Sequence, residues 1–140
     1  MIKVQIPGNP IAKARPRFVR RGKFVQTYNP QETEEGRFMS HFHNHTGIEK
    51  PLSGPLFVRC EFYMARPLSH YGSGRNKNVL KSSSPLHHSK KPDIDNLLKF
   101  VLDSLNGYAW VDDSQIVDIK SNKYYSDDFP KTIITIMEAE

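Results

Sequence analysis

The chain has 140 residues, a length typical of one compact domain, and its 37% hydrophobic and 25% charged residues are those of a globular protein rather than a disordered or fibrous one. Its apolar runs are too short to cross a bilayer, its first residues lack a secretory-signal pattern, and its single cysteine, Cys60, can form neither an internal disulfide nor a zinc site alone. We therefore expect a single cytoplasmic domain over residues 1–140 with no membrane partner. The net charge of +5 and the pI near 9.4 are compatible with a polyanionic partner.

The first 31 residues predict a short strand followed by a basic arm. Ile2, Val4 and Ile6 alternate with polar residues before Pro7-Gly8, which is typical of a half-buried strand. Residues 9–29 have no apolar periodicity, and we expect an exposed arm or a loose hairpin around Arg21-Gly22. No acid occurs from Met1 to Gln31, and the arm's candidate DNA-binding residues are Lys13, Arg15, Arg17, Arg20 and Arg21. Its aromatic residues, Phe18, Phe24 and Tyr28, fit either DNA contact or anchoring of the arm.

A helix, a strand and a long loop are expected next. A helix from about Pro30 to His45 would carry Glu32, Glu34 and Glu35 in its first turns, where the helix dipole favours acids. Residues 56–64 alternate between apolar and other residues, which predicts a strand with Cys60 on its buried face. Residues 66–91 are rich in Ser, Gly, His and Lys and predict a long loop, which in a compact domain is usually functional or disordered.

The loop belongs to a second segment without acids, which runs from Phe62 to Pro92 and ends in the candidate DNA-binding residues Lys90 and Lys91. The two acid-free segments together hold thirteen of the twenty lysines and arginines. This segregation fits phosphate binding, although on charge alone a solvated basic surface explains it equally well.

The last 50 residues predict a helix and two strands. One helix face follows the i, i+3, i+4, i+7, i+8, i+11 pattern through Ile94, Leu97, Leu98, Val101, Leu102 and Leu105. Gly107 would end this helix, and residues 115–125 and 132–138 read as strands joined by a turn at Ser126-Asp127-Asp128. The order β-α-β-α-β-β predicts an α+β domain, with one mixed sheet and about two main helices packed on it.

Acidic residues around the second helix are the candidates for chemistry. Pro92 starts the helix near Asp93, and Asp95 falls at the edge of the apolar face, with Lys99 one turn further on. We expect the chain after Gly107 to return Asp112-Asp113 beside the helix, so that three or four carboxylates converge at one end of it. Clustered carboxylates need a cation, and their hard oxygens suit Mg²⁺ or Mn²⁺, which would bind a scissile phosphate.

Each of these residues also has a purely structural explanation. Asp93 is a favoured helix N-cap, Asp95 and Lys99 have the spacing of an ordinary surface ion pair, and Asp112-Asp113 are common turn residues. Their combination in a basic chain favours a metal, because acids within a phosphate-binding surface weaken binding unless a cation offsets them.

Three motifs around the second helix are Pro92-Asp93-Ile94-Asp95-Asn96-Leu97-Leu98-Lys99, Asp103-Ser104-Leu105-Asn106-Gly107 and Asp112-Asp113-Ser114-Gln115-Ile116. Together they resemble the signature of RusA-type resolvases. Gly8-Asn9-Pro10, Lys13 to Phe18 and Thr27 to Pro30 resemble the arm of the phage and prophage branch, which implies a bacterial or phage-infected cell. The resemblance implies that Asp93, Asp95 and Asp113 bind Mg²⁺, that Lys99 is the catalytic lysine, and that Asp112 is the first acid of the later pair. The long loop at residues 66–91 departs from the family.

The resemblance also implies a homodimer that nicks two opposed strands of a four-way DNA junction. We therefore predict a Mg²⁺-dependent, structure-selective endodeoxyribonuclease that hydrolyses phosphodiesters, and the alternative is a non-catalytic DNA-binding or architectural protein with structural acids. Exposed faces of the strand at 56–64 or of the terminal hairpin are the candidate dimer surfaces.

Two further groups of residues have mainly structural interpretations. The histidines His41, His43, His45, His87 and His88 have no zinc-site spacing. Trp110, which lies between two loop segments, is expected to pack beneath them rather than to stack on a base.

Overall fold

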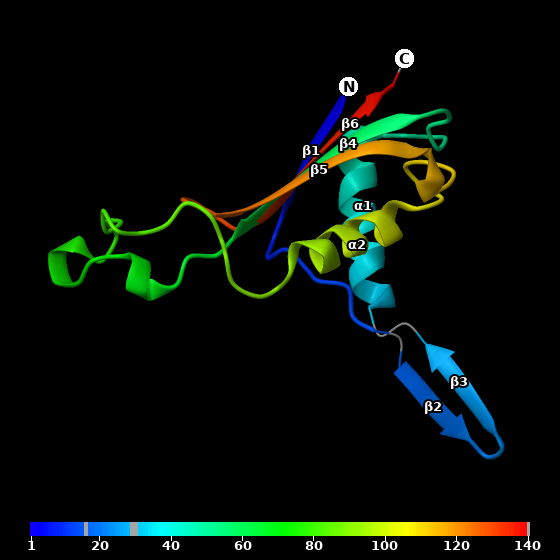
Figure 1. The fold of residues 1–140 in the computed structure, drawn as a ribbon, viewed down its shortest axis with the longest axis horizontal. Helices are drawn as coiled ribbons and strands as arrows, with labels where there is room; N and C mark the ends of the chain where they lie inside the picture. The colour runs from blue at the N-terminus through cyan, green and yellow to red at the C-terminus, as the bar shows by residue number, and fades with distance from the viewer. Residues whose placement is uncertain (16, 29–30, 140) are drawn as a thin grey trace.

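One mixed sheet carries two helices on a single face. The computed structural model describes residues 1–15, 17–28 and 31–139, and it leaves the side chains of residues 17–19, 21 and 24–28 undescribed. Its main elements are β1 (Ile2–Pro7), β2 (Arg17–Arg21), β3 (Phe24–Tyr28), α1 (Glu32–Thr46), β4 (Leu56–Met64), α2 (Ile94–Leu105), β5 (Ile116–Tyr125) and β6 (Lys131–Glu138). Three short 3₁₀ turns are η1 (Leu68–His70), η2 (Gly74–Asn76) and η3 (Asp113–Gln115). The predicted α+β class is confirmed (Figure 1).

The strand order in the sheet is β1-β6-β4-β5, with β4 antiparallel to β6 and parallel to β5. The sheet is mixed, as predicted, but the expected terminal hairpin is wrong, because β4 lies between β5 and β6. The connection from β5 passes the end of β4, where the Ser126 amide donates to the Met64 carbonyl oxygen at 2.8 Å, and the chain then returns on the other side. The parallel β4–β5 pair requires the long crossover that contains α2.

Alternation along β4 places one set of its side chains in the core, and Cys60 is fully buried there as predicted. The apolar face of α2 covers this layer through Leu97, Val101 and Leu105, which are at most 1% exposed. From α1, Phe38 packs edge-on against Phe100 of α2, so the two helices share one core under the sheet.

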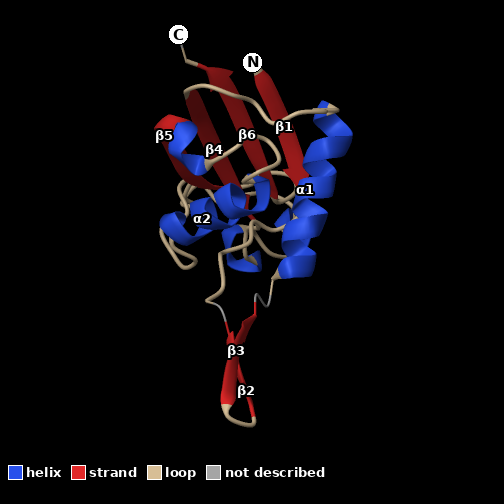
Figure 2. Cartoon of the chain, turned by 90° about the vertical axis from the view of Figure 1, so that its right-hand side faces the viewer, coloured by secondary structure: helices blue, strands red, loops and turns tan. Residues whose placement is uncertain are grey.

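The predicted basic arm contains an antiparallel hairpin of β2 and β3, in which Arg21 is paired with Phe24. Gly22 turns the chain with φ of 61°, a left-handed conformation that favours glycine. Figure 2 shows the hairpin projecting away from the sheet and its helices. Among the described residues, no helix has the length and apolar character needed to cross a membrane.

Candidate active site

Asp93 and Asp95 lie together at the beginning of α2. Asp93 occupies the N-cap position, but its side chain makes no capping hydrogen bond, so the structural explanation for an aspartate there does not apply. Its Oδ2 instead lies 3.2 Å from Nζ of Lys91, and half of the Asp93 side chain remains exposed. Asp95 lies in the first helical turn and is exposed. Both carboxylates are therefore accessible from solvent, at the helix end where the dipole favours negative charge.

Lys99 follows Asp95 by one turn and is also exposed. Within the described part of the chain, Asp95 and Lys99 form no ion pair with each other, so the ordinary surface-pair explanation is not realised. The ammonium group of Lys99, one helical turn from the Asp95 carboxylate, is suited to contact a phosphate bound beside Asp93 and Asp95.

Asp113 lies beside the other end of α2. Its Oδ1 accepts a hydrogen bond of 2.7 Å from Nε1 of Trp110, which is fully buried, as its position between loops predicted. Burial raises the pKa of Asp113, the bond from Trp110 lowers it, and the negative charges of Asp103 and Asp112 raise it, with a net increase. Asp112 caps η3 by accepting from the Ser114 amide, and this contact holds the pKa of Asp112 below its usual value.

The predicted carboxylates thus occupy two places on α2. Asp113 is near Asp103, which lies eight residues after Asp95 and hence about 12 Å further along the helix axis. Figure 1 shows the chain after α2 turning back at the end of the helix that is remote from Asp93. Across the described residues, no three His, Cys, Asp or Glu side chains are close enough to hold a metal together.

The donor chemistry of Asp93 and Asp95 nevertheless fits Mg²⁺. This ion keeps several waters and is commonly bound by one or two carboxylates together with substrate phosphates, rather than by a complete cage of protein ligands. Asp93 and Asp95 are the accessible pair that we expect to hold the ion, while Asp112 and Asp113 each use one oxygen in a hydrogen bond within the structure.

The predicted DNA-binding residues differ in how far their charges are matched. Nζ of Lys13 lies 2.5 Å from Glu35 of α1 and 3.1 Å from Asp103 of α2. Burial lowers the pKa of Lys13, but the hydrogen bonds to these two carboxylates outweigh it and leave the pKa raised. Lys13 thus fastens the arm to both helices. The other described candidates, Arg15, Arg20, Lys90 and Lys91, are exposed, whereas the side chains of Arg17 and Arg21 lie outside the described residues.

Sequence reasoning missed the support beneath Asp93. Lys123, on β5, donates from Nζ to the Lys90 carbonyl at 2.6 Å and to the Pro92 carbonyl at 2.7 Å. These bonds tie the segment that enters α2 to the sheet. A lysine on the side of β5 that faces the core, beside Phe62 of β4, was the available signal.

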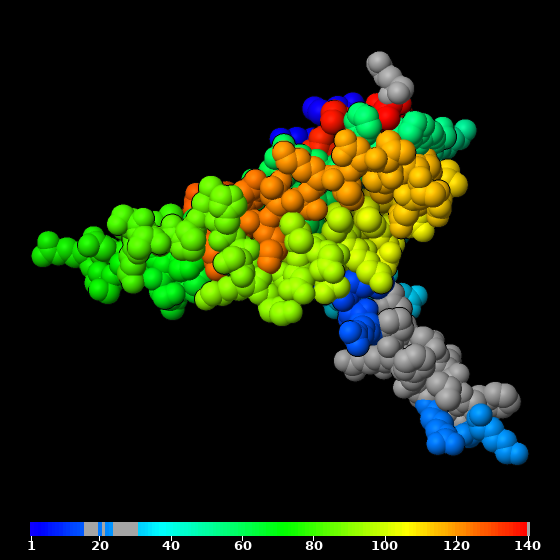
Figure 3. All heavy atoms as spheres, viewed as in Figure 1, coloured from blue at the N-terminus to red at the C-terminus, as the bar shows by residue number. Residues whose placement is uncertain are grey.

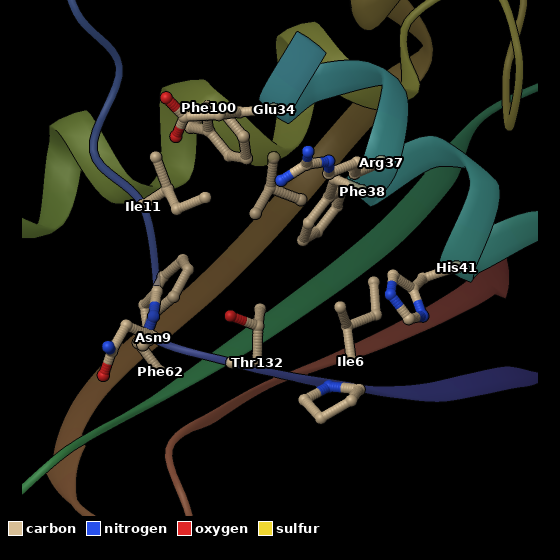
Figure 4. A pocket seen from close by; sticks show the side chains of 14 residues that line it. Ile6, Asn9, Ile11, Glu34, Arg37, Phe38, His41, Phe62, Phe100 and Thr132 are labelled. Atoms are coloured by element: carbon tan, nitrogen blue, oxygen red, sulfur yellow. The ribbon is translucent and has the colours of Figure 1, made fainter. Parts of the chain in front are cut away.

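A pocket of about 530 Å³ lies apart from these acids, between α1, the start of the arm, α2 and the sheet (Figure 4). Phe38, Phe62 and Phe100 line it, with Arg37 and His41 of α1 at its rim. It contains none of the predicted site residues.

The remaining predicted aromatic and histidine positions have structural contacts. His43 contacts the Tyr108 hydroxyl, His87 packs against Tyr124, and Nδ1 of His45 contacts the His41 carbonyl oxygen. The side chains of Phe18, Phe24 and Tyr28 lie outside the described residues.

Nearly the whole chain is similar to known proteins. Residues 7–137 match the family model described as endodeoxyribonuclease RusA. The uncharacterized protein YqaN of Bacillus subtilis (strain 168) is 32% identical over 139 residues, which are 98% of this chain and 96% of that protein. Both similarities span the arm, the strands β4 and β5, and the acidic residues of α2.

Proposed function

Because this chain belongs to the RusA endodeoxyribonuclease family, we propose that it is a Mg²⁺-dependent endonuclease that resolves four-way DNA junctions by paired symmetric nicks. The observation that carries this proposal is the pair of accessible carboxylates, Asp93 and Asp95, with Lys99 one turn away. Neither acid is used as a cap, and the segment that precedes them is basic. A purely structural pair of acids would not explain this arrangement.

The roles of the residues follow from their positions. Asp93 and Asp95 would hold Mg²⁺, which when bound supplies Lewis-acid polarisation of the phosphodiester. Lys99 would stabilise the negative charge that develops on the phosphate oxygens during hydrolysis. Exposed basic residues, Arg15, Arg20, Lys90 and Lys91, would contact the phosphates that flank the cut without reading sequence. Mn²⁺ would substitute for Mg²⁺, because it accepts the same hard oxygen ligands.

The first experiment measures nicking of a labelled synthetic four-way junction with and without Mg²⁺. We expect Asp95→Asn to abolish cleavage while junction binding survives, because the substitution removes a charge and nearly preserves shape. Glu49→Gln is the matched control, since Glu49 is an exposed acid after α1, outside both α2 and the sheet face proposed for the dimer. A chain that binds the junction but never nicks it in Mg²⁺ or Mn²⁺ would support the alternative, a non-catalytic DNA-binding protein.

Metal binding has its own readout. Titration of the protein with Mn²⁺ alone, followed by electron paramagnetic resonance, should show one site per chain that is lost in Asp93→Asn and Asp95→Asn. Retention of that site in both variants would contradict the assignment of the ligands. Asp113→Asn tests whether this third carboxylate contributes to the site.

Paired nicks also require two active sites, so we propose a C₂ homodimer. The sheet face opposite the helices exposes Phe57 and Met137, which are direct neighbours in register on β4 and β6. The mass in solution, measured by light scattering, should be twice 16.1 kDa. Full-rate resolution by a protein that remains monomeric would contradict the dimer.

A further inference from the structure

Residues 66–91, here named the extension, form a protrusion beside the start of α2. Figure 1 shows this segment in green, leaving the body on a different side from the β2–β3 hairpin, and Figure 3 shows that it stands clear of the body as a narrow projection. Its apolar side chains do not hold it to the core, since Leu68 is 89% exposed and Val79 and Leu86 are more than half exposed. The extension therefore contributes little to the core, and its ordered shape needs another explanation.

The base of the extension is clamped to the sheet. The guanidinium of Arg66 donates to Asp127 at 2.9 Å and to the Pro85 carbonyl at 2.7 Å, and it lies over the ring of Tyr125. The Tyr125 amide donates to the Leu86 carbonyl at 2.8 Å. Both ends of the extension are thus joined to β5 and to the turn that follows it.

The outer part has its own backbone framework. The Gly72 amide donates to the Val79 carbonyl at 2.9 Å, and the Lys81 amide donates to the His70 carbonyl at 2.9 Å. A side chain at residue 72 would meet Asn76 at 2.7 to 2.8 Å, so only glycine permits this close approach. A segment with so many internal bonds presents its side chains at defined positions.

Those side chains are basic and unmatched. The extension contains no acid, and Arg75, Lys77 and Lys81 are all exposed. In the part of the chain that the structure describes, none of these three residues forms an ion pair. Burial lowers the pKa of His70, and the positive charges of Arg66, Lys90 and Lys81 lower it further, which reflects the concentration of positive charge here.

The extension is also continuous with the proposed active site. It leads directly through Lys90, Lys91 and Pro92 into Asp93, and the two bonds from Lys123 hold that passage to the sheet. A duplex whose scissile phosphate lies at Asp93 and Asp95 therefore has the extension on one side of the cut. Its charge is complementary to the DNA backbone, which carries one negative charge per ~1.7 Å of duplex.

We propose that the extension is a second DNA-binding element, which contacts the phosphate backbone of one junction arm through Arg75, Lys77 and Lys81. This inference rests on the proposed function, because it takes the DNA to be bound at Asp93 and Asp95. The contacts carry affinity and orientation, and the chemical step belongs to the start of α2.

The test removes the three charges together, as Arg75→Gln, Lys77→Gln and Lys81→Gln. Junction affinity is measured against salt concentration, and we expect the slope of log affinity against log salt to flatten by up to about 2.7, or 0.9 per lost phosphate contact. Single-turnover cleavage at saturating protein should be unchanged, because the substituted residues are remote from the reacting phosphate. Replacing Lys77 and Lys81 with arginine should leave the slope as it is.

The matched control is Lys3→Gln, Lys50→Gln and Lys120→Gln, which lowers the net charge equally. These lysines are exposed, and Lys50 lies after α1. Lys3 and Lys120 lie on the sheet face proposed for the dimer, so light scattering first checks that this variant keeps the wild-type mass, and we then expect the slope to be nearly unchanged. Equal flattening in both triple variants would overturn the proposal, because it would reflect net charge alone.

Cross-linking locates the contact directly. A photoreactive residue at position 77 should attach to one arm of the junction, and the same residue at position 3 should not. An unchanged salt slope without a cross-link at 77 would refute the extension's role, while wild-type cleavage would keep the nuclease assignment intact. Failure of the wild type to nick junctions at all would refute the proposed function instead.

Discussion

The hydrogen bond between Trp110 and Asp113 allows the structural and catalytic roles of Asp113 to be separated. Asp113→Ala removes the acceptor of a fully buried indole N–H, and an unsatisfied buried donor costs about 1–3 kcal/mol. For 140 residues, an unfolding entropy of ~2.1 cal/mol/K per residue converts this loss into a fall in Tm of about 3–10 °C. Asp113→Asn keeps an oxygen that can accept from Trp110, so we expect no such fall.

The pKa of Asp113 determines how the difference in stability between the wild type and Asp113→Asn changes with pH. The folded-state pKa of Asp113 is raised, so the folded protein binds its proton more tightly than the unfolded chain does. The wild type is then favoured below the ordinary pKa of 3.8 and loses this stability as pH rises through the higher folded value. At neutral pH the Asn variant should therefore be as stable as the wild type or more stable, and this advantage should disappear near pH 3.

The assay is thermal denaturation of the wild type and both variants from pH 3 to pH 8, with junction cleavage measured in parallel. A role of Asp113 in the reaction predicts loss of cleavage in both variants, whereas the structural role predicts loss of stability in Asp113→Ala alone. In a Trp110→Phe background the cost of Asp113→Ala should largely vanish, because no donor remains. Equal Tm losses in Asn and Ala, or no loss in Ala, would refute this reasoning.

Three other substitutions test single contacts. Lys13→Met removes the cation that joins Glu35 of α1 to Asp103 of α2, so thermal denaturation should show a loss of about 1–3 kcal/mol, below the cost of a fully buried pair, with little change in the salt dependence of junction binding. Lys99→Ala should lower single-turnover cleavage by ~10²-fold while junction affinity measured by anisotropy stays nearly constant, and a loss confined to affinity would make Lys99 a phosphate anchor. Hydrogen bonds from Ser126 and Lys131 lower the pKa of Asp128 to about 2, so wild-type stability from this group is present above pH 3.8 and lost toward pH 2. Urea midpoints of Asp128→Asn should lack that acid-side loss, and an unchanged pH profile would contradict it.

Local periodicity predicted the elements of this fold well. The alternation over 56–64 and the helical pattern from Ile94 to Leu105 coincide with β4 and α2. Both patterns report which side of an element meets the core, and that information is present in neighbouring residues. Pairing between strands is different. The turn at Ser126 suggested a hairpin, but only the long β4–α2–β5 crossover explains why β5 lies on the far side of β4.

The candidate site was also predictable from the sequence only where it depends on local structure. The positions of Asp93, Asp95 and Lys99 follow from the helix that begins shortly after Pro92, so sequence spacing was sufficient. The place of Asp113 depends on how the chain leaves α2, and spacing alone predicted a convergence with Asp93 that the structure does not contain. The partners of Lys13 lie far along the chain, so its charge appeared unmatched until α1 and α2 were placed beside the arm.

The inner position of β6 has a consequence for folding. This strand follows both β1 and β4 in the chain, yet it lies between them and provides the whole hydrogen-bonded edge of β1. β1 therefore cannot pair until β6 is present, and no complete sheet exists in a chain that lacks Lys131–Glu138. Since α2 packs on this sheet, we expect a chain truncated before β6 not to form the folded domain. The position of the start of α2 on the sheet therefore depends on a strand that lies far from it in the chain.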